Sequence, residues 1–221
     1  SVNDLHLVGY SVPVRTKMQL EELQNHLYSL PEQPDAIPYI TSYYEERWGF
    51  CISHEERLKL QEGVYEIVVD AELFDGELNY GELILDGDTD DEVFLSTYIC
   101  HPSMANNELS GPLVATALGK KFSEEKNSFS LRFIFVPETI GAITYISKNF
   151  QNLKKNVIAG YNLTCIGDER KYSYLPTKYG NTLSDKAANK AFKELKIKFK
   201  KYSFLDRGSD ERQFNSPGVD L

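Results

Sequence analysis

The sequence is short of cysteine, of long apolar runs and of positive charge, and each shortage excludes a class of protein. Its three cysteines, Cys51, Cys100 and Cys165, are odd in number, lie far apart and form no CxxC pair. A disulfide framework is therefore not expected, and a reducing, cytoplasmic setting fits best. No apolar run approaches the ~20 residues that cross a bilayer, so we expect no membrane span and no membrane partner.

Basic residues are too few to balance the acidic ones. The 221 residues include 33 Asp and Glu against 24 Lys and Arg, which gives a formal net charge of −9. Most of such a surface would repel a polyanion, so we expect no nucleic-acid partner. The length suits one large domain, or one domain with a smaller companion.

The two halves of the chain differ in pattern. Residues 1–92 are β-rich and irregular, whereas residues 93–221 alternate strand and helix. We therefore predict an α/β fold, with a mixed sheet flanked by helices in the second half and a smaller β-rich region in the first. Within the first half, "GVYEIVVDAEL" and "ELNYGELILDG" flank Asp75-Gly76, which predicts a β-hairpin.

Aromatic residues are dense in one part of the first half. Tyr43, Tyr44, Trp48 and Phe50 follow a proline-rich stretch. Aromatic side chains bury a large apolar area, so we predict that these four form a small core. The alternative is an aromatic wall beside a binding cleft.

The second half reads as strands that alternate with helices. Predicted strands occupy residues 92–100, 131–136, 156–166 and 196–205. Ser110 and Ser184 stand where helix N-caps occur, ahead of two of the helical patterns. Cys100 and Cys165 fall within apolar strands, and we predict that both are buried, unpaired thiols that bind no metal.

Polar side chains follow three of these strands at the point where each strand ends. His101 follows "FLSTYIC", Glu138 follows "LRFIFVP", and Asp168 follows "YNLTCIG". Open α/β sheets bind ligands outside the carboxyl ends of their strands. One imidazole with carboxylates suits zinc, manganese or iron, and a carboxylate that is not a ligand could serve as a general base.

Each of these residues also has an ordinary structural explanation. His101 could be a hydrogen-bonded turn residue, Glu138 could stabilise the start of the next helix, and Asp168 could belong to a turn. Asn106 and Asn107 would suit a tight loop. The coincidence of three such groups at successive strand ends favours a site.

Four motifs together resemble a known family. They are "STYICHPSMANNELSGP", "PETIGAITYI", "LTCIGD" and "RGSDERQFNSPGVDL", and they are similar to the aminopeptidase-like family related to zinc-dependent aminopeptidases of the phosphorylase/hydrolase-like fold. The resemblance covers essentially the whole chain. It implies an aminopeptidase-like catalytic domain over residues 93–221 and a small inserted domain over residues 1–92. Members are generally described as peptidases and often stand beside surface-polysaccharide genes.

The resemblance implies a ligand set that this chain matches only in part. His101 matches a histidine ligand, and Asn107 stands where the family has a bridging aspartate. The family uses two adjacent glutamates, and here Glu138 alone can fill one role, for which we expect that of general base. Thr164 stands where the next aspartate ligand is usual, with Asp168 as a substitute four residues later.

The end of the chain departs from the family as well. In "RGSDERQF", which resembles the family's "SDH" loop, Glu211 replaces the usual histidine, and Arg207 or Arg212 could recognise a carboxylate. The family's last histidine ligand would come after Leu221, so the chain is expected to be a partial member. Missing elements would leave open sheet edges, and a homo-oligomer is then expected.

The sequence therefore predicts a metal-dependent aminopeptidase-like hydrolase that acts on a peptide or amino-acyl substrate. Glu138 would be the general base, and His101, Asn107 and Asp168 would hold at most one zinc ion. The alternative is a catalytically silent binding domain that recognises a small amino-sugar or peptide ligand in a polysaccharide or modification pathway. A purely structural fragment of a larger assembly is the third interpretation.

Overall fold

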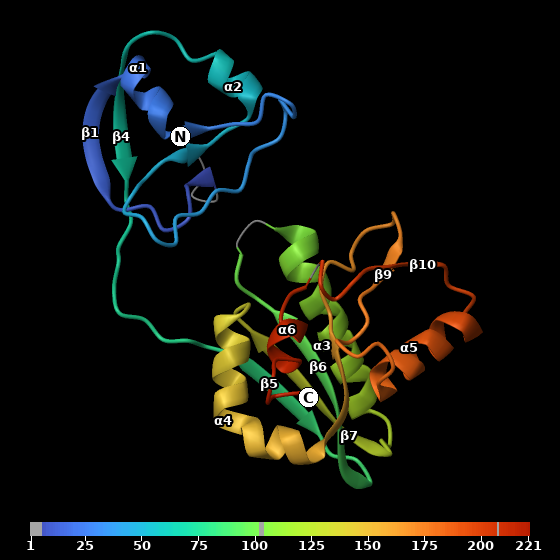
Figure 1. The fold of residues 1–221 in the computed structure, drawn as a ribbon. Coiled ribbons are helices and arrows are strands. Elements are labelled where there is room, and N and C mark those ends of the chain that lie inside the picture. Colours follow the sequence, from blue (N-terminus) through green and yellow to red (C-terminus); the bar gives the residue numbers. More distant parts are fainter. Residues whose placement is uncertain (1–5, 102–103, 207) are drawn as a thin grey trace. The chain divides into compact units, whose positions relative to one another are not determined.

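The chain folds as two units, Ser1–Gly76 and Glu77–Leu221. Figure 1 shows the ribbon of a computed structural model of the protein, coloured along the chain. Each unit has its own core of buried apolar side chains. The structure describes residues 6–101, 104–206 and 208–221.

The stretch around Asp75-Gly76, expected to be a hairpin turn, has no regular secondary structure and joins the two units. Before it, β4 (Val64–Val69) pairs antiparallel with β1 (Val14–Gln19); after it, β5 (Gly81–Leu85) pairs with β7 (Phe129–Val136). The hairpin prediction is therefore wrong, because each strand has its partner in its own unit. For the same reason the units divide ahead of β5 and not at residue 92.

The core of the first unit lies against the antiparallel pair of β1 and β4. Its buried residues are Leu20, Leu23, Leu27, Ile52 and Ile67. The helical turn that follows β1 supplies two of these leucines, so the chain reverses directly over the strand pair. The other elements of this unit are α1 (Leu20–Leu23), η2 (Gln24–His26), β2 (Leu27–Tyr28), β3 (Phe50–Cys51) and α2 (His54–Leu58).

Half of the dense aromatic group joins this core. Trp48 and Phe50 pack against it, with ring centroids 6.2 Å apart in an edge-to-face arrangement. Tyr43 and Tyr44 instead are 55% and 97% exposed. The predicted aromatic core is therefore confirmed for the first pair and wrong for the second.

The second unit is built on a four-stranded mixed sheet in the order β5-β7-β6-β8. β6 (Thr89–Tyr98) lies between β7 and β8 (Val157–Asn162) and is parallel to both, while β5 is an antiparallel edge strand. Helices flank this sheet, as the α/β prediction requires. Its remaining elements are η3 (Ala105–Leu109), α3 (Ser110–Ser123), α4 (Ile140–Asn156), β9 (Tyr172–Tyr174), α5 (Leu183–Glu194), β10 (Phe199–Lys201) and α6 (Glu211–Phe214).

The two faces of the sheet are covered by different helices. Side chains alternate along a strand, so Phe94 of β6 and Ile134 of β7 share a face, and this face packs against α4 and Phe214 of α6. The opposite face meets α3, whose glycines allow close approach. A Cβ on Gly111 would lie 2.5 Å from Oγ1 of Thr97, so a larger residue there would force the helix away.

Two helices begin one or more residues earlier than the sequence suggested. A π-helical turn, η3, precedes α3, so Ser110 lies inside the helical run and its hydroxyl donates to the carbonyl of Asn106 at 2.5 Å. The cap of α5 is Thr182, which forms a capping box with Asp185. Ser184 instead accepts a hydrogen bond from the backbone of Gly160 in β8. Among the described residues, none of the helices is long and apolar enough to span a membrane.

Candidate metal centre

The two central parallel strands bring Cys100 and Glu138 to matching positions. Tyr98 of β6 and Val136 of β7 form the last registered pair, and each of the two site residues lies two positions further along its strand. The backbone N–H of Ile99 donates to the carbonyl of Val136 at 3.0 Å and continues the pairing past the strand ends. Neighbouring parallel strands therefore deliver these two side chains to the same edge of the sheet.

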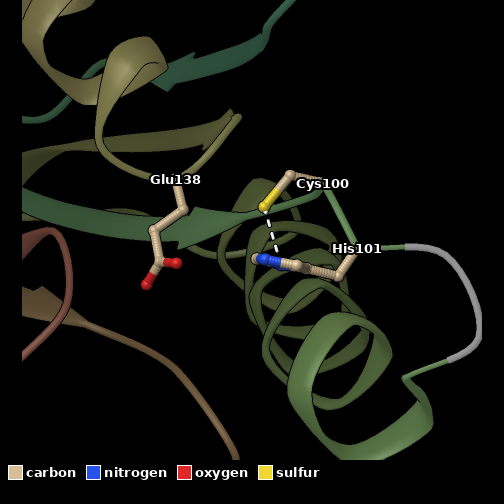
Figure 2. A group of neighbouring side chains, drawn as sticks. All are labelled: Cys100, His101 and Glu138. Carbon is tan, nitrogen blue, oxygen red and sulfur yellow. Dashed lines mark hydrogen bonds between the residues drawn. The ribbon is translucent and has the colours of Figure 1, made fainter. Parts of the chain in front are cut away.

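Cys100, His101 and Glu138 form a compact group of three side chains that can bind a metal ion. One donor atom from each lies within 4.8 Å of the other two, and Figure 2 shows the cysteine and histidine turned toward each other beside the carboxylate. Sγ of Cys100 lies 3.0 Å from Nδ1 of His101. Among the described His, Cys, Asp and Glu residues this is the one such group.

A buried glutamate holds the histidine in place. Glu108, on the π-helical turn η3, accepts a hydrogen bond from the backbone N–H of Cys100 at 2.6 Å and lies 2.7 Å from Nδ1 of His101. A carboxylate can only accept, so Nδ1 carries a proton, and in the neutral imidazole the lone pair is then on Nε2. This is the carboxylate–histidine arrangement that orients metal ligands in many proteins. No sequence motif indicated a role for Glu108, although it lies only seven residues after His101.

A strained turn fixes Glu138. The N–H of Ile140 donates to the carbonyl of Glu138 at 2.7 Å, and Thr139 between them has φ 63° and ψ −70°. These angles define the rarer, strained γ-turn, which a residue with a Cβ adopts only when its surroundings enforce it. The surroundings are the 208–216 loop: Asp210 accepts from the N–H of Thr139 at 2.7 Å, and Ser209 Oγ donates to Glu138 Oε1 at 2.5 Å.

Asp210 is fully buried behind this turn, and its environment disfavours its charge. Burial raises the pKa of Asp210 to about 7, and the negative charges of Glu138 and Glu211 add to the rise, although the hydrogen bond from Thr139 opposes it. Its Oδ2 has no hydrogen-bond partner among the described residues. The loop that resembles the "SDH" motif thus acts here on the position of Glu138.

The prediction that Cys100 and Cys165 are buried is wrong, because both are exposed, while their predicted lack of a disulfide is confirmed. The paired part of β6 ends at Tyr98 and that of β8 at Asn162, so both cysteines lie on the loops that follow. Partial desolvation of the sulfur, together with the neighbouring carboxylates of Glu108, Glu138 and Asp210, raises the pKa of Cys100 to about 11, although a hydrogen bond with the backbone of Glu138 opposes the rise. Without a bound cation this thiol stays protonated at neutral pH.

The structure places Asp168 outside the group of three. It lies six residues beyond the end of β8, where its carboxylate pairs with Arg170 at 2.8 Å and accepts from Nδ2 of Asn106 at 3.2 Å. These contacts, the interaction with Arg170 foremost, lower the pKa of Asp168 to about 2. The apolar pattern of "YNLTCI" continues past the paired strand, and the extra loop carries this aspartate toward the arginine.

Asn107 lies on the π-helical turn η3. Its Nδ2 lies 3.6 Å from Sγ of Cys165, and its Oδ1 is buried with no hydrogen-bond partner among the described residues. Thr164, in the place where the resemblance implies a family ligand, has its hydroxyl bonded to that of Tyr98.

The charged side chains of Glu211 and Arg212, at the start of α6, form hydrogen bonds within the protein. Glu211 accepts from Nδ2 of Asn162 at 2.9 Å and from the N–H of Ser209 at 2.7 Å. Arg212 donates to the carbonyls of Phe204 and Leu205, each at 3.3 Å. Arg207, the other arginine considered from the sequence, lies outside the described residues.

The donor set fits a single zinc ion. Zinc binds sulfur at about 2.3 Å and nitrogen or oxygen at about 2.0–2.2 Å, so its tetrahedral ligand atoms lie roughly 3.3–3.8 Å apart. One ligand atom from each of Cys100, His101 and Glu138 lies within 4.8 Å of the other two, so the side chains have to draw together to reach this spacing around an ion. A thiol, an imidazole and a carboxylate form a borderline set that zinc accepts.

Comparisons with known proteins identify the family of this chain and several similar proteins. The family described as Domain of unknown function (DUF4910) matches residues 6–221. A Clostridium acetobutylicum protein, provisionally named a polysaccharide biosynthesis protein with aminopeptidase-like domain, is 44% identical over 219 residues, or 99% of this chain and 50% of that protein. A crystal structure from Clostridium acetobutylicum, provisionally described as a peptidase, has a TM-score of 0.95 at 44% identity and matches 99% of this chain and 52% of its own.

A more distant structure shares the fold. BSAP, a zinc aminopeptidase from Bacillus subtilis, has a TM-score of 0.59 at 13% identity, over 87% of this chain and 51% of its own. At that identity the likeness concerns the architecture of the sheet and helices alone. The chain spans about half the length of each of these relatives.

Proposed function

This chain belongs to the DUF4910 family, and from that membership we propose that it is a metal-dependent hydrolase of the aminopeptidase-like class. The substrate is a peptide or an amino-acyl compound. The single observation that carries the proposal is the group formed by Cys100, His101 and Glu138 at the carboxyl edge of the sheet. Three protein ligands are the number found in catalytic zinc sites. The fold shared with a zinc aminopeptidase and the name of the Clostridium acetobutylicum relative support the same class.

Each residue of the centre has a stated part in this proposal. Cys100, His101 and Glu138 hold one zinc ion, which would supply Lewis-acid chemistry by polarising the carbonyl of the scissile bond. Glu108 keeps the imidazole proton on Nδ1 and so presents Nε2 as the ligand atom. Ser209 and Asp210 keep the carboxylate of Glu138 and the turn beneath it in one position.

Glu138 can hold the ion or act as a general base, but a single carboxylate fills one role. Its place beside both Cys100 and His101 favours the ligand role over the general base expected from the sequence. The Glu138→Gln variant separates the two. Loss of zinc together with activity identifies a ligand, whereas loss of activity with zinc retained identifies the base.

The test combines metal content with hydrolysis. Chelator-treated protein is dialysed against trace zinc and analysed for its elements, and hydrolysis of leucine p-nitroanilide is followed in parallel. One zinc per chain is expected in the unmodified protein, with zinc and activity lost in His101→Ala. Cys165→Ser, which removes the other exposed thiol, serves as the matched control and should retain both. No zinc in the unmodified chain would sink the proposal.

A catalytically silent binding domain is the second candidate. The observations that favour it are the neutral Asn107 in the place of a family ligand and the engagement of Asp168 by Arg170. Its ligand would be a small amino-sugar or peptide, and the name of the relative suggests a polysaccharide pathway. A ligand that raises the melting temperature of chelator-treated protein, with hydrolysis absent at any zinc level, would favour this candidate.

A further inference from the structure

A cavity of about 780 Å³ lies in the second unit, formed by residues that do not include the three of the candidate metal centre. Its walls come from three stretches: the segment after β9, the end of β10 with the residues that follow, and α6 with the turn after it (Figure 1). The volume falls within the range of roughly 300–1,000 Å³ that is typical of sites for small molecules.

The cavity has the opposite charge to the rest of the chain. Lys178, Lys201 and Arg212 line it, and among the residues that the structure describes no aspartate or glutamate does. The whole chain carries 33 acidic residues against 24 basic ones. Three cations on one concave surface attract anions. The low-dielectric walls of such a surface focus the electric field of the cations, which raises the local concentration of anions.

The cations differ in how firmly they are held. Arg212 donates to the carbonyls of Phe204 and Leu205, and its guanidinium carbon lies 6.0 Å from the centre of the Phe204 ring. These contacts hold it in one position before a ligand arrives. Lys178 lies 3.5 Å from the carboxylate of Asp220, and this ion pair partly neutralises the positive charge of the lysine. Lys201, at the end of β10, is exposed.

The rest of the lining combines aromatic rings with neutral hydrogen-bonding groups. Rings of Tyr179, Tyr202 and Phe204 and two prolines supply apolar faces, and Tyr179 is 59% exposed. Hydroxyl and amide side chains also line the cavity: Thr177, Ser203, Asn215 and Ser216. Aromatic faces suit the C–H side of a sugar ring, and the neutral polar groups suit its hydroxyls.

We propose that this cavity binds a sugar unit that bears an acidic group, either a carboxylate or a phosphate. The acidic group meets the cations, among which Arg212 donates from Nη1, because its Nη2 already donates to the carbonyls of Phe204 and Leu205. The sugar ring lies against the tyrosines, and its hydroxyls meet the neutral polar side chains. This binding site is separate from the proposed zinc centre, and it would operate with or without a bound ion.

The experiment measures binding to chelator-treated full chain by NMR, so that zinc plays no part. The probes are glucuronate, glucose 6-phosphate, glucose and inorganic phosphate. We expect the two acidic sugars, or one of them, to bind at least about tenfold more tightly than glucose or inorganic phosphate, because only they use cations and rings together. Preference between the two identifies the acidic group.

Variants locate the site. Lys201→Gln and Lys178→Gln should each weaken binding of the acidic sugar by about three- to tenfold. Lys193→Gln removes an exposed lysine from α5, outside the lining, and should leave binding unchanged. Equal affinity for inorganic phosphate and sugar phosphate would overturn the proposal, as would equal effects of all three variants or no binding of any acidic sugar.

Discussion

The side chain of Asp210 accepts a hydrogen bond from the backbone N–H of Thr139 at 2.7 Å, across 71 positions of sequence. This bond supports the γ-turn that follows Glu138. We expect Asp210→Ala to lower the free energy of unfolding by about 1–3 kcal/mol, because the N–H of Thr139 loses its partner. Urea unfolding measures the change.

A control for that variant lies four residues earlier in the sequence. Asp206→Ala changes an exposed aspartate and should shift stability by less than about 0.5 kcal/mol. If the proposed zinc centre is present, Asp210→Ala should also weaken zinc binding, since Glu138 loses its support. Equal unfolding curves for the two variants would show that the turn holds without Asp210.

Asn107 supplies no charge at the position where the resemblance seen in the sequence implies a bridging aspartate. Two cations lie ~3.5–4 Å apart in two-metal sites and need negative charge between them. We therefore expect at most one zinc per chain, and expect Asn107→Asp to raise the affinity for a second ion. Gln151→Glu adds the same charge on the exposed side of α4 and should have no such effect. Calorimetric titration with zinc gives the stoichiometry, and two tightly held ions in the unmodified chain would contradict the expectation.

The three thiols differ in accessibility. Cys51 is 2% exposed, whereas Cys100 and Cys165 are exposed. A thiol reagent should label the latter two in the native protein, with Cys100 slowed because its raised pKa keeps the thiol protonated at neutral pH, and should reach Cys51 only on unfolding. Zinc should protect Cys100 and leave labelling of Cys165 unchanged, because only the former is near His101 and Glu138. Mass spectrometry of the labelled peptides measures the extent of labelling at each thiol. Equal protection of both thiols by zinc would contradict the proposal that Cys100 is a zinc ligand.

A buried ion pair stabilises the sheet away from the candidate centre. Arg132 of β7 donates twice to Glu92 of β6, at 2.6 and 2.9 Å, and both are about 95% buried, at 6% and 5% exposure. Arg132→Met should cost about 3–5 kcal/mol, because it leaves a buried carboxylate without its cation. Thermal or urea unfolding provides the measurement.

The matched comparison is the exposed pair of Lys126 and Asp88, at 3.2 Å. Lys126→Met should cost less than about 1 kcal/mol. Replacing Glu92 as well as Arg132 with Met should restore part of the lost stability, because no charge is then buried alone. A double variant no better than Arg132→Met would indicate that the pair acts through packing.

Asp185 makes stability depend on pH in the acid range. Burial alone would raise its pKa, but hydrogen bonds from Thr177, Tyr174 and Thr182 outweigh this and lower it to about 2 from 3.8. Its contribution is present above about pH 4 and is lost as the pH falls toward 2, because the folded state then has to take up a proton against these bonds. The size is roughly 2 kcal/mol.

The Asp185→Asn variant tests this dependence. Its unfolding free energy should fall less steeply than that of the unmodified chain between about pH 4 and pH 2. Lys186→Gln, a neighbouring exposed change in α5, should leave the slope unaltered. Parallel curves for Asp185→Asn and the unmodified chain would show that these hydrogen bonds do not select the charged form.

The sequence predicted the second unit better than the first. The apolar runs of β6 and β7 are buried strands, so their pattern identifies them before any partner is known. The prediction of a hairpin at Asp75-Gly76 was wrong because a turn dipeptide indicates only the local backbone preference. Strand pairing depends on the rest of each unit: β4 pairs with β1 in the first unit, and β5 pairs with β7 in the second.

The candidate centre was predicted in part for a similar reason. His101 and Glu138 were found because both follow strands that are paired with each other. Cys100 was taken as the end of a strand, since an apolar pattern does not reveal where hydrogen bonding stops. Glu108 and Asp210 were missed because their roles depend on a π-helical turn and on a loop from far along the chain.

The shared register of β6 and β7 has a consequence for how this centre can vary. Cys100 and Glu138 stand two positions past the pair of Tyr98 and Val136, so their separation follows the spacing of neighbouring strands, about 4.8 Å. The spacing of the two backbones is thus inherited from strand pairing, whereas Ser209 and Asp210 set where the carboxylate of Glu138 lies. A change in the segment that carries Ser209 and Asp210 would therefore move this carboxylate, while the backbones of the two strands stay at the same separation.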